Sequence, residues 1–281
     1  MYGKESPFGW RNPTTVRQDA PMKIGVLGGT GPAGSGLAAR LASVGFEAII
    51  GSRSKYRALE VRDNLIEKWA DYDLPLFAGD NSEAASADVV VVATPWDAAA
   101  STAKEVAEEL RGKVVISMAN AIAKVGHEFQ PLVPPRGSVA ASVQAAVPQA
   151  MVAGALHHVP AKELGNLRHP CISDVLVCSD HPEATEVTID IVSKLPGMRP
   201  LDSGELSNAA PIEAFVSVML QLNVKYKTRV ALQLTGLEKH FATFETAELK
   251  TPASASGSAT DAGTDAGTAA AGADTGTGSA E

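Results

Sequence analysis

Three glycines at fixed spacing carry the clearest chemical signal in this chain. Gly29, Gly31 and Gly34 follow a short apolar run, residues 23–27, and precede a stretch rich in Ala and Leu. Glycines spaced in this way allow a tight turn, let the backbone touch a pyrophosphate, and let a helix pack closely on a strand, with the phosphates at the helix N-terminus. A second apolar run follows at residues 47–50. The pattern predicts a strand, a turn and a helix that bind a dinucleotide.

The residues after the second apolar run indicate which dinucleotide binds. Enzymes that prefer NAD place an Asp or Glu there, which bonds the ribose 2′-hydroxyl and repels a 2′-phosphate. This chain has Ser52 and Arg53 instead, followed by Lys55 and Arg57 at the start of the next helical pattern. A hydroxyl and a guanidinium both donate to phosphate oxygens, and either later cation adds charge. We predict NADP, preferred over NAD by about two to four orders of magnitude if two charged hydrogen bonds form; the alternative is a solvated basic helix start.

Composition excludes several classes of partner. The chain has 281 residues, 45% of them hydrophobic, and a formal net charge of −8. Since it has no long basic run, nucleic acid is not expected as its main partner, and no apolar run approaches the roughly twenty residues of a membrane span. Cys171 and Cys178 are too few and too far apart for a metal knuckle, and no secretory signal precedes them. We expect reduced structural thiols, no metal, no membrane contact and a cytoplasmic location.

The order of apolar runs predicts the fold. Six expected strands (23–27, 47–50, 88–93, 113–117, 152–157 and 174–178) alternate mostly with helical patterns. This alternation is typical of an α/β fold with a Rossmann-type, doubly wound parallel sheet. Residues 120–137, which contain three prolines, are expected to form a loop or lid, and a long apolar helix is expected to begin at 212 and continue towards 234.

Changes in composition suggest where the parts of the chain begin and end. Residues 1–21 are polar and residues 241–281 are built mainly from Ala, Gly, Ser, Thr and Asp; neither can bury a core, so both are expected to be disordered. Between them we expect an NADP-binding Rossmann domain, 22–160, and a small C-terminal α/β lobe, 161–240.

Two clusters follow expected strands where a cofactor crevice would lie. Thr94, Pro95 and Trp96 come after the run 88–93, and Trp96 could flank a nicotinamide or deazaflavin ring or serve in packing alone. His157 and His158 are placed at the end of the run 152–157. Adjacent residues of a strand point to opposite faces, so one of these histidines is expected to face the crevice, unless both are structural.

A catalytic dyad is hard to find in this sequence. No Tyr-x-x-x-Lys pair and no Gly-x-Ser-x-Gly elbow are present. Lys162 and Asn166 do match the Lys-x-x-x-Asn spacing of 3-hydroxy acid dehydrogenases, in which the lysine is the acid/base and the asparagine orients the substrate. The match is a short one, and a solvated helix turn is the favoured explanation of the same spacing.

Five segments occur in the order of one known family: Gly28 to Gly31, Gly51 to Arg53, Thr94 to Trp96, Leu156 to Ala161, and Gly197 to Asn208. Between about residues 22 and 237 the chain resembles the NADPH-dependent reductases of coenzyme F-420. The resemblance implies reversible hydride transfer between NADPH and an 8-hydroxy-5-deazaflavin, chemistry that needs ring positioning and exclusion of water more than acid/base help.

The resemblance also implies roles for individual residues. Thr30, Ser52, Arg53 and Arg57 would hold NADP phosphates, with Lys55 as the alternative to Arg57, and Pro95 and Trp96 would border the nicotinamide. Backbone groups of Ala161 would meet the carboxamide, His157 and Val159 would line the deazaflavin site, and Arg199 would pair with the anionic groups of that ligand.

Two other functions are compatible with the sequence. One is an NADP-dependent 3-hydroxy acid or imine reductase that uses Lys162, and the other is a non-catalytic NADP(H) redox sensor. For any of the three, the long apolar C-terminal helix favours a homodimer.

Overall fold

A computed structural model describes residues 21–237 of the chain. The segments expected to be disordered, 1–21 and 241–281, lie outside the described residues except for Pro21. Of the described helices, none is long and apolar enough to cross a membrane.

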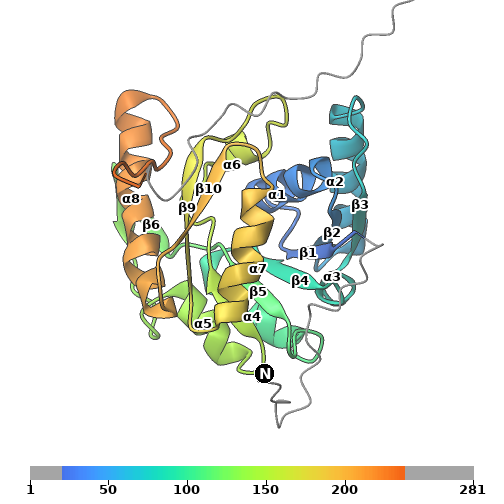
Figure 1. Cartoon of the computed structure of the whole chain (residues 1–281), viewed down its shortest axis with the longest axis horizontal. Helices are drawn as coiled ribbons and strands as arrows, with labels where there is room; N and C mark the ends of the chain where they lie inside the picture. Colours follow the sequence, from blue (N-terminus) through green and yellow to red (C-terminus); the bar gives the residue numbers. More distant parts are fainter. Residues whose placement is uncertain (1–20, 238–281) are drawn as a thin grey trace, which may run out of the picture. The chain divides into compact units, whose positions relative to one another are not determined.

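The first half of the described chain is a Rossmann unit (Figure 1). Its strands are β1 (Lys23–Leu27), β2 (Glu47–Ser52), β3 (Leu76–Asp80), β4 (Val89–Val92) and β5 (Val114–Ser117), joined through α1 (Pro32–Ser43), α2 (Lys55–Lys68), α3 (Asn81–Ala85) and α4 (Trp96–Glu105). β1 pairs in parallel with β2 on one side and with β4 on the other. The chain therefore reverses its direction of travel across the sheet at β1, and a crevice opens beyond the carboxyl ends of β1 and β4.

The second half adds three strands to the same sheet and forms a separate two-stranded sheet. It contributes a hairpin of β6 (Ile122–Val125) and β7 (Glu128–Pro131), then α5 (Val139–Ala146), β8 (Met151–Gly154), α6 (Ala161–Leu164), β9 (Ser173–Ser179), α7 (Pro182–Ser193), β10 (Met198–Asp202), a 3-10 turn at Leu206–Asn208 and α8 (Ala209–Tyr226). The sheet order is β10-β9-β8-β5-β4-β1-β2-β3. The α/β, Rossmann-type fold is confirmed, and the division of 22–160 and 161–240 into two domains stays a prediction.

Several sequence expectations were wrong in detail. β9 runs antiparallel to β8, so the sheet is mixed rather than wholly parallel. Strands β3 and β10 were not predicted, and the expected loop 120–137 contains the antiparallel hairpin β6–β7. The helix expected to continue towards 234 ends at Tyr226, where Lys227 adopts a left-handed conformation.

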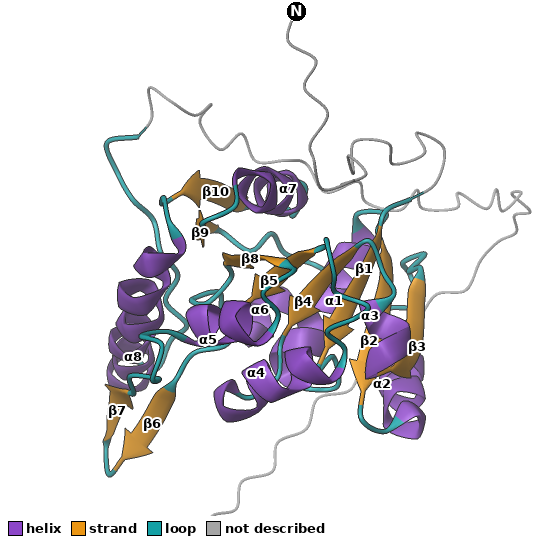
Figure 2. Ribbon diagram, turned by 90° about the horizontal axis from the view of Figure 1, so that it is seen from below, coloured by secondary structure: helices purple, strands orange, loops and turns teal. Residues whose placement is uncertain are grey.

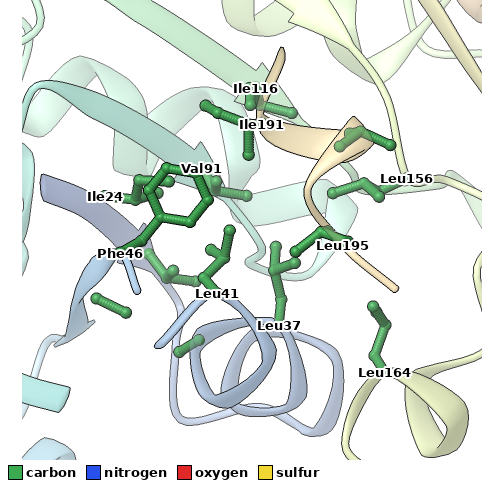
Figure 3. Close-up of a cluster of buried hydrophobic side chains, with 14 of the residues drawn as sticks. Ile24, Leu37, Leu41, Phe46, Val91, Ile116, Leu156, Leu164, Ile191 and Leu195 are labelled. Carbon is green, nitrogen blue, oxygen red and sulfur yellow. The ribbon is translucent and has the colours of Figure 1, made fainter. Parts of the chain in front are cut away.

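Two hydrophobic layers hold the sheet between helices. On one face, Ile24, Val91 and Ile116 meet Leu37 and Leu41 of α1, Ile191 of α7 and Leu195, which follows α7 (Figure 3). On the other face, alternate strand residues such as Val90, Val92 and Val115 pack against α3, α4 and α5. Because both faces are covered, the central strands are apolar at successive positions, as in Val89–Val92.

Helix α8 stands apart from these layers. It lies beside the β6–β7 hairpin in both views (Figure 1, Figure 2). Glu213 of α8 is buried and accepts hydrogen bonds from the backbone N–H groups of Val139 (2.8 Å) and Ala140 (3.0 Å), in the first turn of α5. Burial raises the pKa of Glu213 to about 7, although the two backbone hydrogen bonds act in the opposite direction. This carboxyl group therefore links α8 to the main body of the fold.

Candidate functional site

A cavity of about 380 Å³ lies beyond the carboxyl ends of β1, β4, β5 and β8. Parallel strands present their carboxyl ends at one edge of a sheet, which is where open α/β folds bind ligands. The cavity is lined by backbone and side chains of the following residues: Ala33, Ala93, Thr94, Pro95, Trp96, Met118, Ala119, Asn120, Ile122, Leu156, His157, His158, Val159, Pro160, Ala161, Val216, Met219, Leu220, Asn223 and Val230.

The glycine turn after β1 borders this cavity through Ala33. Gly28 takes the left-handed conformation (φ 74°), and a Cβ there would lie 2.7 Å from Thr94 Cγ2. Gly34 is equally confined, since a Cβ would approach Gly28 O to 2.8 Å. At Gly31, the N-cap of α1, the nearest atom to a Cβ would be 3.5 Å away. The tight bend thus falls one residue before Gly29, and the open backbone at Gly31 is the shape that a pyrophosphate at a helix N-terminus requires.

The basic residues after β2 are only partly available to a phosphate. Ser52 is buried, and Arg53, Lys55 and Arg57 are exposed. Lys55 Nζ is 2.5 Å from Glu83 Oε1, a contact that raises the pKa of this lysine. Within residues 21–237 neither arginine has an ion pair. Of the two cations that the sequence left as alternatives, Arg57 is therefore the more available.

Five buried side-chain polar atoms in the cavity wall have no hydrogen-bond partner within the described chain. Three are ring nitrogens, Nδ1 and Nε2 of His157 and Nδ1 of His158, and the other two are Thr94 Oγ1 and Asn120 Oδ1. Asn120 Nδ2 donates to the carbonyl oxygen of His157 (2.8 Å), which fixes its amide. Buried polar atoms are nearly always satisfied, so the five unpaired atoms are available to bond a polar ligand. Pro95 and Trp96 follow Thr94, and the indole of Trp96 is 37% exposed at the cavity edge.

The two histidines lie in a turn, which corrects the strand expected over residues 152–157. β8 ends at Gly154, and Leu156 adopts a left-handed backbone (φ 64°), which is rare for a branched residue. Because the chain turns here, His157 and His158 are both buried and both line the cavity. The expectation that only one of them faces the crevice assumed that both lie on a strand, and they do not. Such local strain is concentrated at functional sites in folded proteins.

The cavity wall is electrically neutral. Among the residues between 21 and 237 that line the cavity, none is Asp, Glu, Lys or Arg. Burial and the neighbouring ring of His158 lower the pKa of His157 to about 3, and burial lowers that of His158 to about 4 although Asp174 acts in the opposite direction. Leu176 N–H donates to His158 Nε2 (3.4 Å), as a neutral ring requires. At neutral pH this wall therefore offers hydrogen bonds and apolar surface, with no ionised side chain.

A buried arginine fixes the wall segment that carries Ala161. Arg40 of α1 is 1% exposed and donates to the carbonyl oxygens of Leu164 (2.9 Å), Glu163 and Asn166 (2.6 Å each). Gly36 and Gly165 let α1 and α6 approach, because a Cβ on Gly36 would lie 2.9 Å from Gly165 N. Ala161 is thereby held at the cavity, while Lys162 and Asn166 of the alternative reductase pattern are not among the lining residues.

Comparisons with known proteins agree with this geometry. Residues 23–121 match the family model described as NADP oxidoreductase, coenzyme F-420-dependent. The F-420-dependent NADP reductase of Methanocaldococcus jannaschii is 38% identical over 223 residues, which cover 77% of this chain and 100% of the relative. The chain belongs to the F-420-dependent NADP reductase family.

Two further relatives support the same assignment. The F-420-dependent NADP reductase of Methanothermobacter marburgensis is 34% identical, over 77% of this chain and 99% of the relative. A crystal structure from Arthrobacter sp. FB24, provisionally described as an F-420-dependent NADP reductase, matches with a TM-score of 0.63 and 25% identity, over 76% of this chain and 100% of the other.

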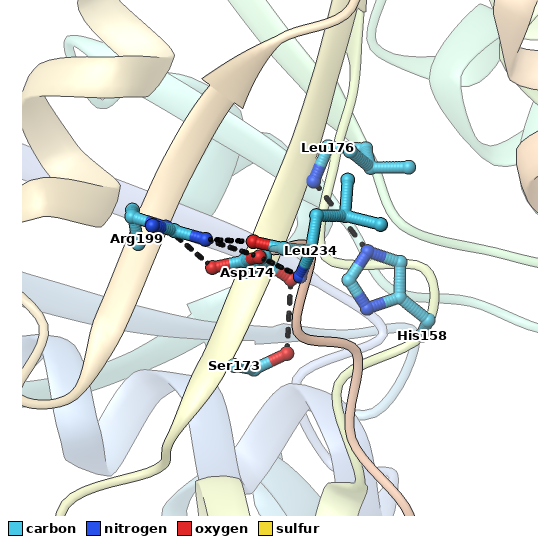
Figure 4. A network of polar contacts seen from close by, with 6 residues as sticks. All are labelled: His158, Ser173, Asp174, Leu176, Arg199 and Leu234. Carbon is cyan, nitrogen blue, oxygen red and sulfur yellow. Dashed lines mark hydrogen bonds and ion pairs between the residues drawn. The ribbon is translucent and has the colours of Figure 1, made fainter. Parts of the chain in front are cut away.

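One residue that the family resemblance assigned to a ligand is already engaged by the protein. Arg199 of β10 forms two 2.7 Å hydrogen bonds to the carboxylate of Asp174, which is fully buried (Figure 4). The same carboxylate accepts from Leu234 N–H (2.5 Å), and Arg199 donates to Leu234 O (2.8 Å). In this member of the F-420-dependent NADP reductase family, Arg199 therefore fixes the segment 228–236, called the strap below. Its expected pairing with the anionic groups of the deazaflavin stays untested.

Besides the segments that follow the strands, the cavity has a further wall, called the third wall below, that the sequence did not single out. This wall comes from α8, with Val216, Met219 and Asn223, and from Val230 of the strap. Asn223 Oδ1 accepts from Val230 N–H (2.6 Å) and so joins helix and strap. The apolar pattern of α8 was the one sequence signal for this wall. It was not specific, because the same pattern also fits a helix that fills a core. Asn120 was missed for a similar reason, since it stood inside a proline-containing segment taken for a loop.

Proposed function

We propose that this protein catalyses reversible hydride transfer between NADPH and the 8-hydroxy-5-deazaflavin coenzyme F-420. The observation that carries the proposal is the neutral, largely apolar cavity beside the dinucleotide turn, whose two histidines are uncharged at neutral pH. Hydride transfer between two rings needs no ionised acid or base, whereas reduction of an oxo acid to a hydroxy acid, or of an imine to an amine, needs a proton donor at the substrate. Neither Lys162 nor Asn166 of that alternative lines the cavity.

On this proposal the phosphates of NADP are held by the segments that follow β1 and β2. Gly31 leaves the backbone open to the pyrophosphate, which Thr30 also contacts, while Gly29 and Gly34 allow the close packing of the turn. Ser52, Arg53 and Arg57 hold the 2′-phosphate. The open backbone at Gly31 and the two unpaired guanidinium groups support these roles. Lys55 contributes less, because Glu83 competes for its ammonium group.

The nicotinamide and deazaflavin rings are placed by the segments that follow β4 and β8 and by α8. Thr94, Pro95 and Trp96 border the nicotinamide, with Ala161 bonding its carboxamide through backbone groups. His157 and Val159 line the deazaflavin site opposite the apolar residues of α8. NADPH supplies the hydride from C4, and the deazaflavin receives it at C5. The protein contributes by orienting the two rings at about 3–3.5 Å and by excluding water.

The proposal is tested by mixing purified protein with NADPH and oxidised F-420 and following the visible absorption of the deazaflavin. Rapid bleaching is expected with NADPH, and much slower bleaching with NADH at the same concentration. FMN in place of F-420 should not be reduced at a comparable rate.

An absence of bleaching while NADPH binds tightly would contradict the proposal and favour the redox sensor. Turnover of NADPH with a 3-oxo acid or an imine instead, lost in Lys162→Ala, would favour the alternative reductase.

We also propose that the protein works in the cytoplasm and that two copies associate through α8. The observation that supports the dimer is a set of exposed apolar side chains on that helix: Phe215, Val218, Val224 and Tyr226. Light scattering of Phe215→Ser/Val218→Ser against the wild type tests this, since loss of a dimer is expected in the variant and a monomeric wild type would refute it.

A further inference from the structure

A second hollow adjoins the cavity and differs from it in charge. Its volume is about 510 Å³, and it is lined by Lys162, Glu163, Lys227, Thr228 and Arg229. Three of these five side chains are cationic and one is anionic. The protein as a whole has a net charge of −8, so this groove is a local reversal of charge that attracts anions. We call these five residues the basic groove.

The basic groove is continuous with the cavity along the chain. Ala161 lines the cavity and Lys162 the groove; Val230 lines the cavity and Arg229 the groove. Asn223, in the cavity wall, accepts from Thr228 N–H through its backbone oxygen (3.1 Å) and from Val230 N–H through its side chain (2.6 Å). Both edges of the groove are thus fixed to the wall of the ligand cavity.

The backbone at Lys227 is unusual. It ends α8 in the left-handed conformation (φ 51°, ψ 43°), where glycine is the common residue because a Cβ is strained there. A lysine in this position keeps a long cationic side chain at a conformational cost. Strain of this kind is found at sites where the side chain has a function.

The cations of the groove are not neutralised equally. Glu163 forms an ion pair with Arg229, which fixes that guanidinium. Within residues 21–237, Lys162 and Lys227 have no ion pair and no hydrogen bond from their ammonium groups. The groove therefore has two ammonium groups that can bind an anion, in addition to a positioned arginine.

We propose that the basic groove binds the anionic tail of the deazaflavin, its phosphodiester and carboxylate groups, while the ring occupies the cavity. The inference rests on the proposed function, which supplies a ligand that has a neutral-walled site for its ring and negative charge beyond it. The NADP phosphates have separate contacts at the turn 28–34 and at residues 52–57, so they do not need this groove. Lys162 is then a specificity residue for the acceptor and not the acid/base of another reductase.

The test compares two acceptors that share one ring. F-420 carries the anionic tail, and 8-hydroxy-5-deazariboflavin carries only the uncharged ribityl chain. In the double variant Lys162→Gln/Lys227→Asn, the KM for F-420 should rise about two- to thirtyfold, because two exposed charge contacts are lost and each contributes about 0.2–1 kcal/mol. The KM values for the tail-less acceptor and for NADPH should stay within about twofold. Asn is chosen at 227 because it tolerates the left-handed backbone.

A matched double variant, Lys68→Gln/Lys104→Gln, removes two exposed lysines elsewhere and should leave the KM for both acceptors unchanged. The single variant Lys162→Glu, which replaces attraction by repulsion, should affect F-420 alone in the same direction. Equal KM changes for the two acceptors, or none, in an active enzyme would overturn the groove and leave the proposed function intact. A wild type that reduces neither acceptor with NADPH would overturn both.

Discussion

Arg53 stands where β2 passes into α2 and is exposed, without an ion pair in the described part of the chain. In Arg53→Ala we expect the KM for NADPH to rise about tenfold or more and the KM for NADH to change little, because a charged hydrogen bond to the 2′-phosphate contributes about 1.5–3 kcal/mol. Steady-state kinetics with both nucleotides measures this.

Lys55→Ala is the matched control for that experiment. Its ammonium group is paired with Glu83, so its removal should raise the KM for NADPH less than removal of Arg53 does. If Arg53→Ala weakens NADPH and NADH equally, the guanidinium does not contact the 2′-phosphate.

At the scale of elements, the strap depends on one buried ion pair. Asp174 is fully buried and accepts hydrogen bonds from Arg199 and from the strap at Leu234. Arg199→Met leaves that carboxylate without its cation in a buried site. We expect the free energy of unfolding to fall by about 3–5 kcal/mol, as for other buried pairs that lose one partner. Urea denaturation measures the loss.

Arg111→Met is a suitable comparison, since Arg111 pairs with Glu108 on the surface. There we expect a loss of less than about 1 kcal/mol. Similar losses in the two variants would mean that Asp174 is not as isolated from solvent as its burial indicates.

Glu213 joins two elements in a comparable way. Its two carboxylate oxygens accept from the first two N–H groups of α5, while Ser138 Oγ accepts from Ala141 N–H (3.0 Å). In Glu213→Gln an amide NH₂ group must face one of these N–H donors. We expect a loss of about 1–3 kcal/mol in the free energy of unfolding, because one buried donor remains unsatisfied. Glu186→Gln, at an exposed position of α7, should change it by less than about 0.5 kcal/mol.

At the scale of the whole molecule, the Rossmann half was predictable because its signals are local. The glycine turn, the apolar strands and the basic residues after β2 each occupy a few consecutive positions, and the structure brings them to one edge of the sheet. The order of motifs sufficed to identify the family, which the comparisons confirm.

The third wall was not predictable because it depends on contacts between distant residues. Asn223 is joined to Val230, and Asp174 to Leu234, by hydrogen bonds that have no signature in the local sequence. The turn at Leu156 was not predicted for a different reason. Leucine rarely adopts a left-handed backbone, and here the surrounding fold imposes it. As a result, the sequence assigned one histidine to the crevice where the structure has two.

Those two histidines give the molecule a specific dependence on pH. Their pKa values, about 3 for His157 and about 4 for His158, lie below the usual 6.5. Between these values and pH 6.5, the two rings are protonated in the unfolded chain and neutral in the folded chain. The stability that the neutral rings contribute is present above pH 6.5 and is lost as the pH falls below it, by up to about 1.4 kcal/mol per pH unit for each ring. Glu213 acts in the opposite sense, since its pKa is raised to about 7 and its protonation favours the folded chain.

The contribution of His157 to this pH dependence can be isolated by comparing a variant with the wild type, because both contain Glu213 and the other carboxylates. We expect the free energy of unfolding of His157→Gln, measured in urea at pH 7.5, 6 and 5, to fall less steeply on acidification than that of the wild type. His127→Gln, at an exposed position of the β6–β7 turn, should follow the wild type. Parallel curves for His157→Gln and the wild type would mean that folding does not lower the pKa of His157, so that the ring gains a proton near pH 6.5 in the folded protein as well, and this would contradict a buried ring that stays neutral in the cavity wall.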